Sequence, residues 1–357
     1  MKKTQNPFTH MYGTAGQAYI NMGWAEKAIE NFSYDKPSEY VYKIIGARGS
    51  GKTVVLSDIL GYFRNKELAK DGFLVYDLSS ARDPLHTLVA YLTEEDFSGK
   101  KKLSGLHLSA SVGVVNAGLS LDSSESEKYR DDEVELDKLL AKAFDKGKKI
   151  LVCIDDIVKT EAMTAFCSVY AKYIRVGAPF YFICTGLYSN INALGRVRSL
   201  TFFRRAESIE VRALSEVSVT MKYKKFFGIE TEEARKLAML TKGYAYAYQV
   251  LGSLYFNKKE TESLEDLIDD FDEILFSQSY EKIWEELTGG EKTLLKIMLE
   301  YRKREEILKQ MKKPGNYSEY RSSLIRGGLI RETARGEIDF CLPRFEEYIR
   351  YFCLDLD

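Results

Sequence analysis

The sequence predicts an α/β fold in which helices cover both faces of a parallel sheet, because short apolar runs alternate with longer helical patterns. The apolar runs are rich in β-branched residues and nearly continuous, which is typical of strands buried on both faces. Strands that alternate with helices favour a doubly wound sheet. The predicted strands are EYVYKIIG (39–46), FLVYDLS (73–79), ILVCIDD (150–156), PFYFICTG (179–186) and SIEVRAL (208–214).

Helical patterns lie between the predicted strands, and one insertion interrupts them. Residues 53–64 and 131–146 repeat apolar side chains with helical spacing, and Gly147 follows the second pattern as a C-terminal stop. By contrast, LHLSASVGVVNAGLSLD (106–122) alternates apolar residues with small or polar ones. Because a period of two is typical of strands, we expect a β-hairpin inserted at about residues 103–122.

The length of 357 residues exceeds what one compact core usually holds, so we expect more than one domain. Residues 260–286 carry eleven acids and one base, which is typical of a solvated helical connector. After Thr288, which with Glu291 forms a capping-box pattern, three helical segments precede two short strands. The predicted domains are an α/β domain (1–215), a small helical lid with the acidic connector (216–286) and a C-terminal winged helix-turn-helix (287–357).

Composition and charge exclude several classes of protein. The formal net charge of −1 does not indicate nucleic acid or acidic membranes as partners of the whole chain. The five cysteines are odd in number and scattered, which is typical of buried reduced thiols. Because the chain has only three histidines, we do not expect a metal site built on histidine. We find no signal peptide and no membrane-spanning run, so we expect a cytoplasmic protein without a membrane partner.

Residues 46–53 read GARGSGKT, a full match to the phosphate-binding pattern GxxxxGK[ST] between a predicted strand and a helix. Glycines let successive backbone amides turn inward around an anion, and the dipole of the following helix favours negative charge there. We expect Lys52 to reach the β- and γ-phosphates and Thr53 to bind Mg²⁺. The predicted nucleotide-binding residues are Gly46, Ala47, Arg48, Gly49, Ser50, Gly51, Lys52 and Thr53.

Polar side chains end two further predicted strands. ILVCIDD ends in Asp155 and Asp156, and in such sites an acid at the end of the strand next to that of the phosphate-binding loop holds Mg²⁺. Asp155 fits that role, and Asp156 fits the orientation or deprotonation of the attacking water. Thr185 ends FICTG and is predicted to contact the γ-phosphate or this water. Acids and threonines also end ordinary strands, and that alternative stays open.

The chain resembles the bacterial and archaeal ATPases of the AAA+ and STAND clades, including origin-recognition-like and NB-ARC-like members. The resemblance is carried by GARGSGKT, ILVCIDD, FICTG, FFRRAESIEVRAL, TKGYAYAYQ and the terminal LPRFEEYIR. It implies that Asp155 is the Walker B magnesium residue, Asp156 the activating acid and Thr185 the sensor-1 residue. It also implies that Arg205 senses the γ-phosphate or acts across a subunit interface of a homo-oligomer. A solvated arginine is the alternative.

The chain departs from the pattern of these ATPases at three places. Gly243-Tyr244-Ala245 replaces the usual Gly-x-Pro, which puts the usual lid contact to the nucleotide in doubt. Gly23-Trp24 stands where a Gly-Arg pair is common, so the adenine pocket is expected to be built differently. The second Walker B acid, Asp156, is shorter than the usual glutamate, which predicts slow turnover and favours a regulatory switch.

The sequence therefore predicts an ATP-binding, Mg²⁺-dependent ATPase that signals through its C-terminal winged helix to DNA or to a protein. Residues 302–335 carry ten basic and four acidic residues, and arginines on a helix and wing are suited to DNA. The candidate DNA-contacting residues are Tyr317, Tyr320, Arg321, Arg326, Arg331 and Arg335. Two other functions stay open. They are an ATP-gated binding protein with negligible hydrolysis and a small-molecule kinase.

Overall fold

The computed structural model describes residues 5–9, 11, 13, 15–34, 36–68, 72–95, 131–258 and 264–354. Its α/β part is built on a five-stranded sheet of order β2-β3-β4-β1-β5, in which all neighbouring strands are parallel. The five predicted strands are confirmed, whereas the hairpin predicted at about 103–122 lies outside the described residues. The strands are β1 (Val41–Ile45), β2 (Phe73–Leu78), β3 (Lys149–Ile154), β4 (Phe180–Gly186) and β5 (Glu207–Glu210).

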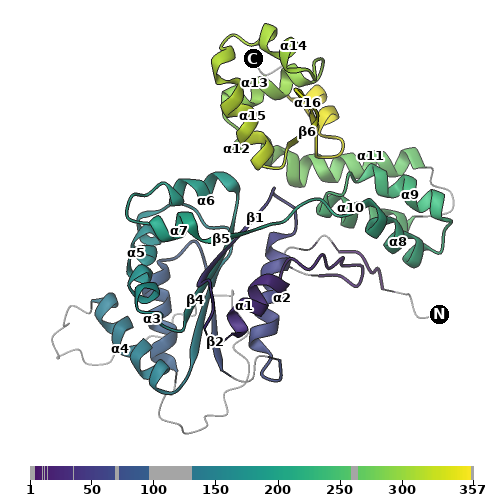
Figure 1. Ribbon diagram of the computed structural model, residues 1–357. Coiled ribbons are helices and arrows are strands. Elements are labelled where there is room, and N and C mark those ends of the chain that lie inside the picture. Colours follow the sequence, from purple (N-terminus) through teal and green to yellow (C-terminus); the bar gives the residue numbers. More distant parts are fainter. Residues whose placement is uncertain are drawn as a thin grey trace, which may run out of the picture.

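Helices cover both faces of the sheet, as predicted (Figure 1). In β3, Leu151 and Cys153 face one hydrophobic cluster, and Val152 and Ile154 face the other. This division explains why each strand reads as a continuous apolar run. One face carries α1 (Glu26–Ser33) and α2 (Lys52–Arg64). The other face carries α3 (Pro84–Glu94), α4 (Asp132–Asp145), α5 (Glu161–Arg175), α6 (Tyr188–Gly195) and α7 (Thr201–Arg205).

The chain is helical after the sheet, as the pattern of residues 216–286 predicts. Figure 1 shows these helices beside the α/β part, where α10 and α11 lie close to the C-terminal region. A π-helical turn joins α11 to α12, and such turns often occur at functional sites. The elements are α8 (Glu216–Phe227), α9 (Thr231–Leu240), α10 (Ala245–Asn257), α11 (Leu264–Leu275), the π-helix η1 (Phe276–Tyr280) and α12 (Glu281–Glu286).

The C-terminal region contains three α-helices, an antiparallel hairpin and a last helix in the predicted order. Thr288 and Glu291 form the predicted capping box. The winged-helix assignment and the domain boundaries stay predictions. The elements are α13 (Gly289–Met298), α14 (Arg304–Gln310), the 3₁₀-helix η2 (Pro314–Asn316), α15 (Tyr317–Arg326), β6 (Ile330–Ala334), β7 (Glu337–Phe340) and α16 (Phe345–Phe352).

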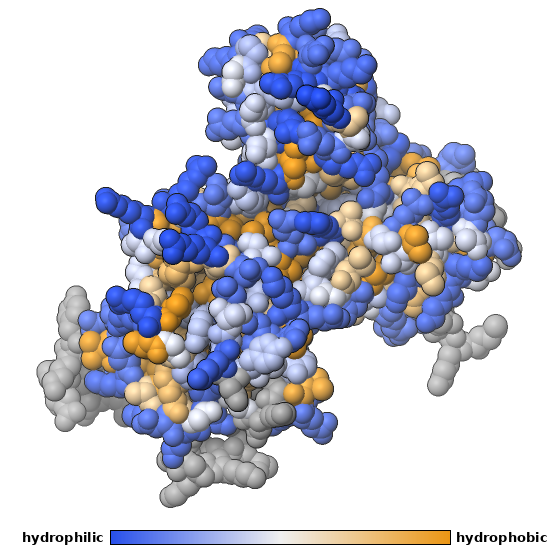
Figure 2. Space-filling model, viewed as in Figure 1, coloured by the Kyte–Doolittle hydropathy of each residue, from blue (hydrophilic) through white to orange (hydrophobic). Residues whose placement is uncertain are grey.

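One hydrophobic cluster runs through the lid helices and the C-terminal region and also includes Phe8 near the start of the chain. Figure 2 shows hydrophilic residues over most of one face, with apolar residues gathered where the parts of the molecule meet. The backbone N–H of Thr9 donates to Gln249 Oε1 on α10 (2.9 Å), and Asn6 donates to Ser253 on the same helix. The N-terminal segment therefore packs against the lid rather than only against the sheet.

Gly252 on α10 has no side chain and so makes room for the Phe8 ring. We therefore expect alanine at this position to destabilise the protein, although alanine in place of glycine usually stabilises a helix. A Cβ on Gly252 would lie 2.3 Å from the Phe8 ring, whereas a Cβ on Gly61 in α2 meets no described atom within 4 Å. We expect Gly61→Ala to raise the free energy of unfolding by about 1 kcal/mol. We expect Gly252→Ala to lower it by about 1–2 kcal/mol, because overpacking outweighs the gain in helix propensity. Urea unfolding of both variants tests this, and equal stabilisation would contradict the packing described.

All five cysteines are free thiols, as predicted, and Cys341 is the partly exposed one. Burial raises the pKa of the Cys167 thiol to about 12 and the pKa values of Cys153 and Cys184 well above the ordinary value. None of the helices in the described ranges combines the length and apolar character that a membrane span needs.

Candidate functional site

The predicted phosphate-binding loop is formed between β1 and α2. Gly49 and Gly51 adopt positive φ angles of 72° and 98°, a conformation that side-chain-bearing residues rarely adopt. Helix α2 begins at Lys52, directly after Gly51. The backbone amides of the loop and the positive end of the α2 dipole therefore lie at one place, where they favour an anion.

Lys52 is buried, with 8% of its surface exposed, and its ammonium group lies over its own loop. Its Nζ donates to the carbonyl oxygens of Gly46 (3.2 Å) and Ala47 (2.9 Å). Burial lowers the pKa of Lys52 to about 8, and the negative charges of Asp156 and Asp155 partly oppose this shift. A buried cation whose hydrogen bonds to the described residues go to two neutral carbonyls is suited to exchange them for phosphate oxygens.

Three predicted residues meet at the carboxyl ends of β3 and β4. Thr53 Oγ1 donates to Asp155 Oδ2 (2.9 Å), and the hydroxyl of Thr185 donates to Asp155 Oδ1. The same Thr185 oxygen accepts the backbone N–H of Asp156 (2.8 Å). Asp156 adopts a positive φ of 50°, which is uncommon for a non-glycine residue and often marks a functional position.

The expectation that Asp155 ends a strand next to β1 is corrected by the sheet order. Strand β4 lies between β1 and β3, so Thr185, rather than Asp155, lies at the end of the strand that is paired with β1. The contact between Thr53 and Asp155 shows that the start of α2 nevertheless reaches the end of β3. Thr185 is fully buried at this position, where it fixes both the Asp155 carboxylate and the Asp156 backbone.

The donor set at this position fits a nucleotide with Mg²⁺. The hydroxyl of Ser50 is buried and has no hydrogen-bond partner among the described residues, which leaves a polar group of the loop for a ligand. The Thr53 hydroxyl and the Asp155 carboxylate are oxygen ligands of the kind that Mg²⁺ prefers.

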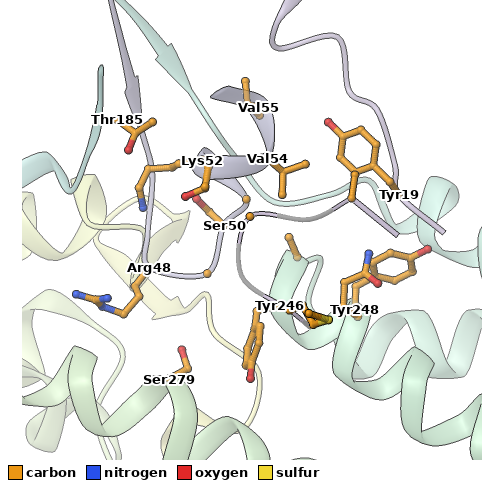
Figure 3. Close-up of a pocket in the computed structure, with 18 of the residues that line it drawn as sticks. Tyr19, Arg48, Ser50, Lys52, Val54, Val55, Thr185, Tyr246, Tyr248 and Ser279 are labelled. Carbon is orange, nitrogen blue, oxygen red and sulfur yellow. The ribbon is translucent and has the colours of Figure 1, made fainter. Parts of the chain in front are cut away.

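These residues line a cavity of about 440 Å³ that continues to the N-terminal segment and to α10. Figure 3 shows Lys52 and Thr185 at one side of the view and Tyr19 and Tyr248 at the other. The cavity therefore has a charged end at the loop and an aromatic end. The side chains that line the apolar part include Met11, Tyr19, Ile20, Trp24, Val54, Val55, Leu214, Tyr246 and Tyr248.

Trp24 at the aromatic end agrees with the expectation of an adenine pocket that is built differently, whereas Tyr19, Tyr246 and Tyr248 share no sequence motif and come from segments far apart in the chain. Ser279 and Lys282 of the acidic connector also line the cavity, although the sequence predicts only a solvated face there. By contrast, Arg205 is exposed at the end of α7 and is absent from the described lining of this cavity. Its predicted role across a subunit interface stays a prediction.

The lid contacts the loop through Tyr244 and Tyr246, in and next to Gly243-Tyr244-Ala245, where the usual proline is missing. The Tyr244 hydroxyl donates to the backbone carbonyl of Arg48 (2.8 Å) and forms a hydrogen bond with Ser279 Oγ (2.9 Å). The backbone N–H of Tyr246 donates to the carbonyl of Gly49 (3.1 Å). Tyrosine hydroxyl and backbone contacts thus join the lid to the loop without a proline.

The end of α12 and the C-terminal region also reach the loop and the end of β4. Arg48 forms an ion pair with Glu286 at the end of α12. A Cβ on Gly328, between α15 and β6, would lie 3.1 Å from the Ala47 side chain. Arg326 at the end of α15 lies over the Tyr188 ring, 5.0 Å from its centroid. The end of the candidate DNA-contacting helix therefore lies against the loop and against the residues that follow β4.

Gly49 and Gly51 offer a matched pair that tests the loop. A Cβ on Gly49 would lie 2.2 Å from the Tyr244 hydroxyl, whereas a Cβ on Gly51 meets no described atom within 4 Å. We expect Gly51→Ala to lower the free energy of unfolding by about 1–2 kcal/mol, the cost of its backbone angle. Gly49→Ala is expected to cost about 1–3 kcal/mol more, because it also displaces Tyr244. Urea unfolding of the nucleotide-free variants measures both, and equal losses would contradict the Tyr244 contact.

Two solved structures with a similar fold come from archaea. The chain is similar to a Walker-type ATPase of Pyrococcus abyssi, with 14% identity and a TM-score of 0.58 over 93% of this chain and 96% of that chain. It is also similar to the ORC2 protein of Aeropyrum pernix in ADPNP–ADP complexes, with 13% identity and a TM-score of 0.56 over 98% and 96% of the two chains. These likenesses show the fold, so the predicted resemblance to AAA+ P-loop ATPases is confirmed at that level.

One protein-family profile matches part of the chain. It covers residues 277–349 and is described as "Domain of unknown function (DUF8462)". The match begins in η1 and includes Ser279, Lys282 and Glu286, the connector residues that line the cavity or contact Arg48. No curated protein matches the chain.

Proposed function

We propose that this protein binds ATP with Mg²⁺ at Gly46–Thr53 and hydrolyses it slowly, as a nucleotide-controlled switch. One observation carries the proposal. A buried lysine at the start of a helix shares a cavity with Thr53, Asp155, Asp156 and Thr185. Such a combination of amide dipoles, one ammonium group and paired carboxylates suits a triphosphate rather than a neutral ligand.

The side chains of the loop have different roles in binding the triphosphate and Mg²⁺. Lys52 exchanges its contacts to the Gly46 and Ala47 carbonyls for the β- and γ-phosphates, and the Ser50 hydroxyl gains a partner. Thr53 and Asp155 are suited to hold Mg²⁺, which supplies positive charge to the phosphate oxygens when bound.

Hydrolysis needs a water oriented opposite the leaving group. Its oxygen forms a bond to the γ-phosphorus while the bond from that phosphorus to the β–γ bridging oxygen breaks. The Asp156 carboxylate takes the proton of the water, and ADP and inorganic phosphate leave. Thr185 fixes the Asp156 backbone through its hydrogen bond and so positions this carboxylate. Since Asp156 is one methylene shorter than a glutamate, we expect slow turnover.

The aromatic end of the cavity suits a purine base. Tyr19, Trp24 and Tyr246 line it together with aliphatic residues. Flat apolar walls bind a base by stacking and by removal of its faces from water. We propose adenine as the base, on the resemblance to the ATPases with this fold.

The C-terminal region is proposed to receive the signal. Ala47 of the loop lies against Gly328, and Tyr188 after β4 lies against Arg326. Because both contacts lie at the end of α15, a change in the loop or at the end of β4 alters the position of that helix. The nucleotide state is thereby passed on to the surface that the partner contacts.

DNA is the partner that we propose for residues 302–335. A second cavity of about 840 Å³ between α14, α15 and the β6–β7 turn is lined by Lys303, Arg304, Arg321 and Arg335. Cations at such a surface contact phosphates. Arg321, however, is paired with Glu332, and carboxylates of Glu305 and Glu337 also line this cavity. A protein partner is therefore the other outcome of the test.

Phosphate release from MgATP by the purified protein, with and without duplex DNA, tests this function. Slow hydrolysis that duplex DNA stimulates, with the stimulation lost at high salt, would support both the ATPase and the DNA partner. Hydrolysis that DNA does not change would assign residues 302–335 to a protein partner. No phosphate release above that of the buffer would overturn the proposed hydrolysis.

A further inference from the structure

The ion pair between Arg48 and Glu286 joins the phosphate-binding loop to the end of α12. Arg48 is the third residue of the loop, and its side chain lines the nucleotide cavity. Figure 3 shows Arg48 on the loop, beside the helix that carries Ser279. Because 33% of the Arg48 side chain and 43% of the Glu286 side chain are exposed, the pair is reached by water and can be exchanged.

The guanidinium of Arg48 has hydrogen-bonding capacity that the protein does not use. Its Nε is buried and has no hydrogen-bond partner among the described residues, while its NH2 group contacts Glu286. The backbone of Arg48 is held separately, because its carbonyl accepts the Tyr244 hydroxyl. The side chain is therefore free to change partner without a change in the loop. A planar guanidinium fits a phosphate group through two parallel hydrogen bonds.

Glu286 occupies an unfavourable position for a protein that binds a polyanion. It places a carboxylate beside a loop that gathers amide dipoles and the Lys52 ammonium group. One helical turn earlier on α12, Lys282 lines the same cavity. The end of α12 thus carries the Glu286 carboxylate one turn after the Lys282 ammonium group. The carboxylate neutralises the charge of Arg48 while no phosphate is bound.

We propose that Arg48 is a ligand of the terminal phosphate of the bound triphosphate and that Glu286 competes with this phosphate for it. The inference rests on the proposed ATP binding and adds a role for the Arg48 side chain. An exposed ion pair is weak, and a phosphate that accepts two charge-assisted hydrogen bonds is the stronger partner. Triphosphate binding thereby breaks the Arg48–Glu286 contact. Because the chain runs from α12 through Thr288 into α13, loss of the Glu286 contact changes the position of the C-terminal region.

A double-mutant cycle on these two residues tests the competition. The probe is a non-hydrolysable ATP analogue with Mg²⁺, titrated calorimetrically into the full chain. Glu286→Gln is expected to raise the affinity by about two- to fivefold, the range of an exposed ion pair. Arg48→Gln is expected to lower it by about tenfold or more, and to lower ADP affinity less. In the double variant, Glu286→Gln should have no further effect, because Arg48 is the group for which it competes.

The controls separate competition from a general change in charge. Glu285→Gln removes the same charge from the exposed neighbouring position and should leave the affinity unchanged. Arg48→Lys keeps the charge but loses the planar fork, so it should recover only part of the affinity. An increase in affinity from Glu286→Gln that persists in the Arg48→Gln background would overturn the proposal.

Tryptophan emission reports the release of α12 independently of affinity. The chain has two tryptophans, Trp24 at the cavity and Trp284 two residues before Glu286, so the difference in emission between the wild type and Trp284→Phe reports Trp284. We expect the MgATP analogue to change Trp284 emission, and Arg48→Gln to abolish this change at saturating analogue. If the wild type binds the analogue through Lys52 but Arg48→Gln changes neither affinity nor emission, this inference alone fails. If the wild type does not bind the analogue, the proposed function fails.

Discussion

Replacement of Lys52 by alanine is expected to lower kcat/KM for ATP hydrolysis by about 10²–10³-fold, because it removes a positioned charge from the phosphate end of the cavity. Among the described residues, the buried ammonium group donates hydrogen bonds to two loop carbonyls, and it lies in the same cavity as Asp155 and Asp156. Steady-state phosphate release from wild type and variant, at matched MgATP concentrations, measures the loss.

Lys43 is a matched control for this variant. It is a second buried lysine close to the loop in the sequence, in β1. Its Nζ, however, donates to the backbone carbonyl of Phe203 in α7 (2.9 Å). Lys43→Met is expected to change stability while leaving kcat/KM within about threefold, well below the loss expected of a positioned charge. Equal losses from the Lys43 and Lys52 variants would show that the effect comes from folding and not from phosphate contact.

Asp156→Asn is expected to abolish hydrolysis while leaving nucleotide binding intact. Asparagine tolerates the positive φ of this position and keeps the backbone N–H that Thr185 accepts. Loss of the proton acceptor is expected to lower kcat by about 10²–10⁴-fold. Binding of the MgATP analogue by calorimetry and phosphate release, measured on the same preparation, separate the two effects.

The neighbouring acid gives the contrast. Asp155 accepts the hydroxyls of Thr53 and Thr185, so Asp155→Asn is expected to weaken the dependence of binding on Mg²⁺. Hydrolysis that is unchanged in Asp156→Asn would contradict the role of this residue. If the wild type binds the analogue but shows no hydrolysis for the variant to lose, the ATP-gated binding protein is the correct function.

The fold could be predicted because its signals are local. A strand buried on both faces, such as residues 150–154, is apolar at every position, and the loop motif lies in eight consecutive residues. The capping box of Thr288 and Glu291 is likewise readable from spacing alone. The order of the strands could not be predicted, because an apolar run does not indicate which other strand pairs with it. For that reason the insertion of β4 between β1 and β3 appears only in the structure.

The site was predictable at its phosphate end and not at its aromatic end. Lys52 and Thr53 follow from a motif, whereas Tyr19 and Tyr246 reach the same cavity from segments more than two hundred residues apart. The acidic connector gives no signal of a binding role, because charge runs usually face solvent. Its Glu286 contacts the loop through a tertiary arrangement that no local pattern encodes.

Calorimetric titration of the full chain with a non-hydrolysable ATP analogue, in the presence and absence of Mg²⁺, tests the central claim most directly. The arrangement of Lys52, Thr53 and Asp155 predicts saturable binding of one nucleotide that Mg²⁺ strengthens and Lys52→Ala removes. Heats that remain at the level of dilution with both metal and analogue present would contradict it.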